Sequence, residues 1–91
     1  MAWARPYPLL HGEVASYPPV SVFRSLLVAA RERAGVSQSA VAGRLGRPQS
    51  FVAKYEGGER RLDVVEFIQV CAALGVDPAA LIGDLKSWPG T

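Results

Sequence analysis

The chain has little of the residues on which many kinds of chemistry depend. Its single cysteine, Cys71, excludes an internal disulfide, and its single histidine, His11, stands apart from any partner ligand. No apolar run approaches the ~20 residues that a membrane-spanning helix needs. The first residues lack the charged region and apolar segment of a signal peptide. We therefore expect a cytoplasmic protein that does not contact the membrane.

The spacing that catalytic groups require is also missing. No nucleophile stands at a fixed interval from a base, and no glycine-rich loop is suited to cradle a phosphate. His11 is expected at the surface, and Cys71 falls within an apolar helical pattern, where it would fill the core. We expect no catalytic residue, no metal site and no cofactor, and hence a protein that is not an enzyme.

What the chain does have is helical periodicity over most of its length. With 91 residues, of which 49% are hydrophobic, it can form one domain with one core. The patterns predict an all-α fold of five helices, the first running from Ser21 to about Ala34. We divide the chain into a tail rich in proline and aromatic residues (1–19), a helical domain (20–86) and a C-terminal tail (87–91).

The fourth helix is predicted to begin at Asp63, which with Glu66 forms a capping-box pattern. Its expected water-facing residues include Glu66, and its expected buried stripe consists of Val64, Phe67, Ile68, Cys71 and Leu74. A fifth helix begins at Asp77-Pro78. Its periodicity extends to Trp88, which could either close the core or pack against a second subunit.

Two short helices joined by a tight turn occupy the middle of the chain, from Ser37 to Glu56. Ala42 is small enough to lie where two helices cross, and Gly46 four residues later can adopt a left-handed turn. Val52 resumes the apolar pattern beyond the turn. This spacing predicts a helix-turn-helix.

Charge is distributed unevenly around this motif. Residues 31–61 contain seven basic and three acidic side chains, a local charge of +4, although the whole chain carries only +2. Residues 62–91 carry −3. Such an accumulation of positive charge is typical of a surface that binds a polyanion.

The chain resembles the phage-repressor and Cro-type (XRE-like) family of helix-turn-helix proteins, from about Phe23 to Leu85. The resemblance implies a five-helix lambda-repressor-like bundle with the helix-turn-helix at helices two and three. The residues that carry the resemblance are Arg31, Ala34-Gly35, Gln38, Ala42, Leu45-Gly46, Gln49-Ser50, Val52, Glu56, Gly58 and Ala73-Leu74-Gly75.

By that resemblance, the third helix would lie in the major groove of DNA. The positions that match the family's base contacts are Gln49, Ser50 and Lys54. Phe51 would also lie on this side, where it could touch a thymine methyl group or instead pack against the fourth helix. The resemblance further implies a structural ion pair between Arg31 and Glu56.

Phosphate contacts are expected around the same helix. Gln38 would bind a phosphate at the start of the second helix and brace Gln49, as the resemblance implies. Arg47 stands where the family usually has an apolar residue, and we expect it to join the phosphate contacts. The other basic residues expected to contact phosphates are Arg44, Arg60 and Arg61.

These patterns lead to one functional hypothesis and one alternative. The hypothesis is sequence-specific binding of double-stranded DNA by a small transcriptional regulator, a repressor that acts as a homodimer. The alternative is a protein-interaction module, such as an antitoxin or a subunit of a larger regulator. Its hydrophobic anchors would be Trp3, Tyr7, Tyr17 and Trp88.

Overall fold

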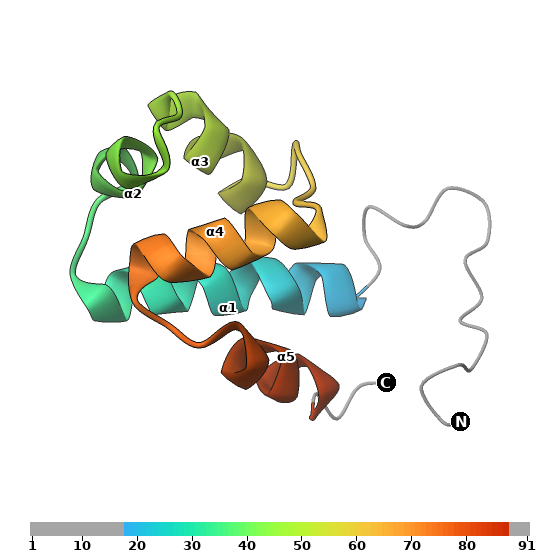
Figure 1. Ribbon diagram of the computed structural model, residues 1–91. Coiled ribbons are helices and arrows are strands. Elements are labelled where there is room, and N and C mark those ends of the chain that lie inside the picture. Colours follow the sequence, from blue (N-terminus) through green and yellow to red (C-terminus); the bar gives the residue numbers. More distant parts are fainter. Residues whose placement is uncertain (1–17, 88–91) are drawn as a thin grey trace.

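A computed structural model describes residues 18–87, and these residues contain five α-helices, as predicted (Figure 1). The predictions for Trp3, Tyr7, Tyr17, His11 and Trp88 lie outside the described residues. The helices are α1 (Pro18–Ala34), α2 (Gln38–Leu45), α3 (Gln49–Glu56), α4 (Val64–Leu74) and α5 (Pro78–Lys86).

The helices form a bundle whose two ends differ. Figure 1 shows α2 and α3 together at one end and α5 at the other, with α1 and α4 between them. Helix α2 packs on α3 and α4, while α1 contacts α3, α4 and α5. One core joins all five helices, and its buried residues are Leu27, Ala30, Val41, Ala42, Phe51, Val52, Tyr55, Phe67, Val70, Cys71, Leu74 and Leu81.

Local signals in the sequence define the helix-turn-helix. The Ser37 hydroxyl accepts a hydrogen bond from the Ala40 backbone N–H at 3.0 Å, which caps α2. Gly46 ends α2 with φ of 67°, in the left-handed region that favours glycine. Ala42 is buried on α2, the helix that packs on α3 and α4. The predicted roles of these residues therefore agree with the structure.

Helix α1 begins at Pro18, three residues before the predicted start at Ser21. A proline in the first turn does not disturb a helix, because the backbone N–H that it lacks has no partner there. The density of prolines was therefore a poor guide to where this helix starts.

Helix α4 buries a different face from the one predicted. Val64 and Ile68 were expected in the core but are 72% and 49% exposed, whereas Val70 is fully buried. Glu66, expected to face water, is buried. Successive residues turn by about 100° around a helix, so Ile68 lies at the edge of the stripe formed by Phe67, Val70, Cys71 and Leu74. Helix α4 carries apolar residues on more than one side, and only its packing against neighbouring helices selects the side that is buried.

Within residues 18–87, no single helix is long and apolar enough to cross a bilayer, and α4 with α5 meets that test only as a pair bent by 113°. The same residues hold no group of three or more histidine, cysteine, aspartate or glutamate side chains placed to bind a metal ion.

Candidate nucleic-acid interface

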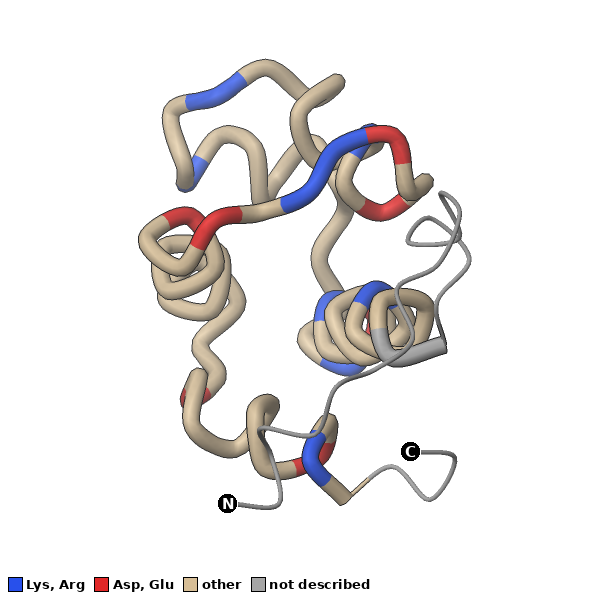
Figure 2. Tube along the Cα trace, turned by 90° about the vertical axis from the view of Figure 1, so that its right-hand side faces the viewer, with Lys and Arg blue, Asp and Glu red and all other residues tan. Residues whose placement is uncertain are grey.

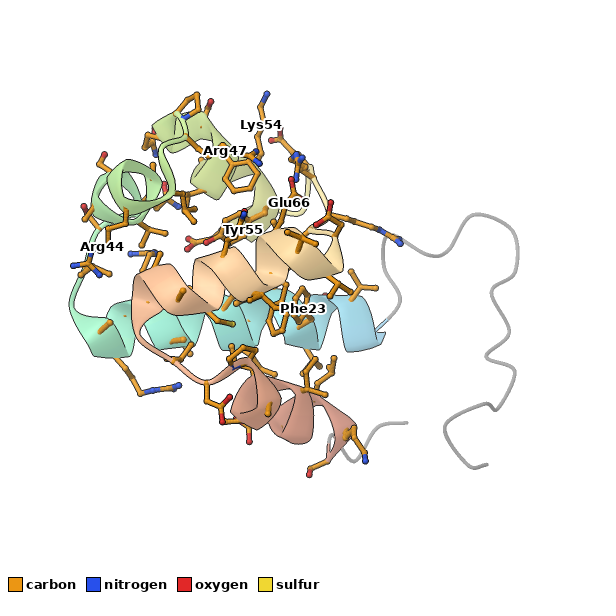
Figure 3. All side chains as sticks on the ribbon, viewed as in Figure 1. Phe23, Arg44, Arg47, Lys54, Tyr55 and Glu66 are labelled. Atoms are coloured by element: carbon orange, nitrogen blue, oxygen red, sulfur yellow. The ribbon has the colours of Figure 1, made fainter. Side chains whose placement is uncertain are left out.

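Helix α3 has one polar outer side and one apolar inner side. Gln49, Ser50 and Lys54 are exposed, and Figure 3 shows Lys54 projecting outward from the end of the bundle formed by α2 and α3. Val52 and Tyr55 are buried beneath them. Burial, and then the nearby Glu56 carboxylate, raises the pKa of Tyr55 to about 12, so its hydroxyl stays neutral. The helix thus presents three polar side chains from a fixed apolar base.

The exposed Gln49 side chain is held in place by its neighbour on α2. Its amide nitrogen, Nε2, donates a hydrogen bond to Oε1 of Gln38 at 2.7 Å. Gln38 in turn donates from Nε2 to Oε1 of Glu56 at 2.9 Å. A chain of hydrogen bonds therefore runs from the end of α3, through the first residue of α2, to the start of α3.

The structure also brings Arg31 and Glu56 into contact. Arg31 donates from Nε to Oε2 of Glu56 at 2.7 Å and from Nη2 to Oε1 at 3.1 Å. Its Nη1 donates to the Val36 carbonyl oxygen at 3.0 Å. The hydrogen bond to Glu56 raises the pKa of the Arg31 guanidinium above its ordinary value. This bidentate pair fixes the end of α3 against α1. We call these four residues, Arg31, Gln38, Gln49 and Glu56, the Glu56 network.

Phe51 does not lie on the outer side of α3, which corrects its predicted contact with DNA bases. Its ring is 8% exposed and packs edge-on against Tyr55, with 5.6 Å between the ring centroids. The guanidinium carbons of Arg47 and Arg60 lie 4.4 and 4.8 Å from the centroid of the ring. Phe51 therefore belongs to the core, and two cationic side chains lie over its ring.

Glu66 joins these two arginines, a contact that was not predicted. Arg60 donates from Nη1 to Oε1 at 2.9 Å and from Nη2 to Oε2 at 2.8 Å. Nη2 of Arg47 lies 3.5 Å from Oε2. The bonds from Arg60, and then the one from the Asp63 backbone N–H, lower the pKa of Glu66 to about 2. We call Arg47, Phe51, Arg60 and Glu66 the Glu66 cluster.

Little in the sequence indicated this contact of Glu66 with the two arginines. The capping box of α4 already explains why a glutamate stands at this position, and it requires no arginine. Arg47 lies 19 residues away along the chain, and only the packing of α2 against α4 brings it near. The one local signal was Arg60, which precedes Glu66 by six residues.

The remaining basic residues do not all gather beside α3. Figure 3 shows Arg44 on the opposite side of the α2–α3 pair from Lys54. Nη1 of Arg44 donates to the Ala73 carbonyl oxygen at 2.7 Å, near the C-terminal end of α4, where carbonyl groups lack helical partners. Arg44 therefore lies apart from Arg47, and its predicted phosphate contact stays a prediction. Arg61 is exposed in the loop between α3 and α4.

Figure 2 shows where basic and acidic residues lie along the chain. Blue basic segments mark the upper part of the molecule, and one of them lies in the loop between α3 and α4 with red acidic segments on either side. Acidic residues therefore flank the basic positions of this loop along the chain. What α3 offers is a set of amide, hydroxyl and ammonium groups, with guanidinium groups beside it.

Comparisons with known proteins agree with this geometry. A family model described as a helix-turn-helix domain matches residues 22–81. The chain is similar to the structure of an XRE-family-like protein from Pseudomonas syringae pv. tomato str. DC3000, with 47% identity and a TM-score of 0.76 over 79% of this chain and 88% of that one. It is also similar to the restriction-modification controller protein C.AhdI from Aeromonas hydrophila. That match has 28% identity and a TM-score of 0.66 over 78% of this chain and 99% of that one. The search of curated proteins gives no match.

Proposed function

The chain belongs to the XRE family of helix-turn-helix DNA-binding transcriptional regulators, and from this premise we propose that it binds specific sequences of double-stranded DNA as a repressor in the cytoplasm. The five-helix lambda-repressor-like fold that the sequence predicted is confirmed, and so is the family. The family consists of regulators rather than enzymes. The proposal concerns which residues read DNA, how many copies bind, and the sign of regulation.

One observation carries the proposal: Gln49, Ser50 and Lys54 share the exposed side of α3, and Gln49 is held by Gln38. A helix of this kind fits the major groove with its first residues toward the bases. A glutamine amide can pair with the N6 and N7 atoms of adenine, and a lysine with the O6 and N7 acceptors of guanine. We therefore assign base recognition to these three residues.

Phosphate binding is assigned to the cationic and amide groups around α3. Gln38 is the first residue of α2, where free backbone N–H groups favour an anion. Arg47, Arg60 and Arg61 lie in the segments that flank α3 and are exposed. Such contacts would fix the position of the domain on the duplex but would not select its sequence. Arg44 is left out because its guanidinium group caps α4.

A second copy of the chain would supply the affinity that one small domain lacks. Two copies would bind half-sites about 34 Å apart, one turn of the duplex. The described residues expose apolar side chains that a homodimer could cover: Val64, Val65, Ile68 and Ile82. A dimer of this size bound over a promoter would compete with the polymerase for the same DNA, and for this reason we propose repression.

Two substitutions test the assignment on a duplex selected from a random library. Gln49→Ala should reduce the preference for the selected duplex over a scrambled one. Arg47→Ala should weaken both duplexes and lower the slope of log K against log salt by about 1. Fluorescence anisotropy at several salt concentrations measures both effects.

Matched controls come from exposed residues elsewhere. Gln69→Ala removes an exposed amide on α4, and Lys86→Ala removes a cation on α5, at the other end of the bundle. Both controls should bind like the wild type. If Gln49→Ala and Arg47→Ala also behaved like the wild type, the interface would be wrongly assigned.

Sedimentation of the complex gives the number of copies, and a promoter-reporter assay gives the sign of regulation. A stoichiometric protein partner without DNA binding would favour the interaction-module alternative.

A further inference from the structure

Glu66 has an unusual position for an acidic residue next to a surface assigned to DNA. A carboxylate repels phosphate groups, so one that served only as a helix cap would be better replaced there by a neutral group. Glu66 nevertheless lies between α4 and the Arg47 and Arg60 side chains, and its own side chain is 11% exposed. Its surroundings explain why a negative charge is useful at this point.

A counter-charge favours the arrangement in which both arginines lie over Phe51. Both guanidinium groups lie within 4.8 Å of the centroid of one ring, so their positive charges are close together. The attraction of each cation to the ring is weak at an exposed site and would be offset by their mutual repulsion. Glu66 faces both guanidinium groups and removes part of that repulsion.

The arrangement leaves the cations on the outside and the anion beneath them. The side chains of Arg47 and Arg60 are 38% and 39% exposed. A guanidinium group has five N–H donors, and Glu66 accepts two bonds from Arg60. Donors of both arginines therefore remain to contact an anion in solution. Ring and carboxylate together reduce the side-chain freedom that each arginine would lose on binding.

We propose that Glu66 is a positioning residue for DNA binding, which holds Arg47 and Arg60 on the face of Phe51 so that both contact backbone phosphates. This inference rests on the proposed function, because it assumes that the side of α3 flanked by these arginines faces DNA. Glu66 would then contribute to DNA binding without touching DNA, since its negative charge would repel the phosphates. Glu66 acts through the two arginines alone.

The substitution Glu66→Gln separates this role from simple electrostatics. Glutamine keeps a carbonyl oxygen that can accept the hydrogen bond from the Asp63 backbone N–H, so the cap of α4 is retained. It also makes the protein more positive by one charge, which by itself tightens binding to DNA. If Glu66 positions the arginines, affinity should instead fall about three- to fivefold, the factor that corresponds to one exposed ion pair. The salt slope should fall by about 1.

Glu59→Gln is the matched control, since it makes the same change of charge on an exposed residue of the loop between α3 and α4. It should leave DNA binding unchanged or tighten it slightly. If Glu66→Gln behaved like Glu59→Gln, the positioning role would be overturned while DNA binding stood. If the wild type bound no duplex from the random library, the proposed function would fail, and this inference with it.

A second comparison guards against an effect on folding. Glu66→Gln should have no weakening effect when Arg47 and Arg60 are both already glutamine, because there is then nothing to position. An equal loss of affinity in that background would show that Glu66 acts through α4 rather than through the arginines, and would overturn the proposal. Thermal melting by circular dichroism of each variant shows which of them are folded at the temperature of the binding assay.

Discussion

The Glu56 network and the Glu66 cluster both hold side chains beside α3 in place, but they do so with different partners. Each has a mostly buried glutamate that accepts hydrogen bonds from the side chains beside α3. The partners of Glu56 are a largely buried arginine and Gln38, which in turn holds the neutral Gln49. The partners of Glu66 are two arginines with more than a third of each side chain exposed.

The difference matches the groups that each glutamate controls. The Glu56 network ends in an exposed amide, which can both donate and accept and so can distinguish bases. The Glu66 cluster ends in cations, which attract any phosphate regardless of sequence. We infer that the first region serves base selection and the overall fold, and the second serves affinity. Three predictions test this division, in order of decreasing effect on stability.

The largest effect is expected from Glu56→Gln. It leaves the Arg31 guanidinium, only 16% exposed, without its counter-charge, and we expect a loss of about 3 kcal/mol in the free energy of unfolding. Glu66→Gln should cost less, because its arginine partners keep part of their hydration. Urea denaturation followed by circular dichroism measures both, with Glu59→Gln as a variant of unchanged stability. A cost for Glu66→Gln that equalled or exceeded that of Glu56→Gln would contradict the division.

An intermediate effect is expected from Phe51→Leu. Leucine keeps the residue apolar but removes the ring face under the two guanidinium groups, and we expect a loss of about 1–2 kcal/mol. Phe23→Leu is the matched variant, because its ring packs on Phe67 at 5.3 Å and no guanidinium group of the described residues is stacked on it. Only Phe51→Leu should also weaken DNA binding in the anisotropy assay. Equal effects of the two variants on binding would show that the stacked arginines do not matter.

The smallest effect concerns pH. The pKa of Glu66 is lowered from its ordinary value of 4.5 to about 2. A lowered pKa means that the charged form stabilises the fold above pH 4.5, and that this contribution is lost as the pH falls toward 2. The stability difference between the wild type and Glu66→Gln should therefore be constant above about pH 5 and should shrink toward zero as the pH falls below this value. Urea denaturation at a series of pH values tests this. A difference that persisted at pH 2 would have to come from packing rather than charge.

Most of the fold could be predicted from the sequence because its signals are local. The Ser37 cap, the Gly46 turn and the small Ala42 are each determined by a few neighbouring residues. The family resemblance added Arg31 and Glu56, which no local pattern would have paired across 25 residues. Residues at the edge of the core were harder to predict. Phe51 is apolar and lies next to exposed positions, so periodicity alone could not decide whether it faced the core or the solvent.

The sequence by itself determined the five helices, the tight turn between α2 and α3, and the polar outer side of α3. Helical periodicity and capping act over a few residues, and they hold whatever the helices pack against. Only the tertiary structure decided which side of α4 is buried, that Arg44 caps α4, and that Glu66 joins Arg47 and Arg60. These outcomes depend on how the helices cross, because a side chain on one helix acquires its partners from residues that are distant in the chain.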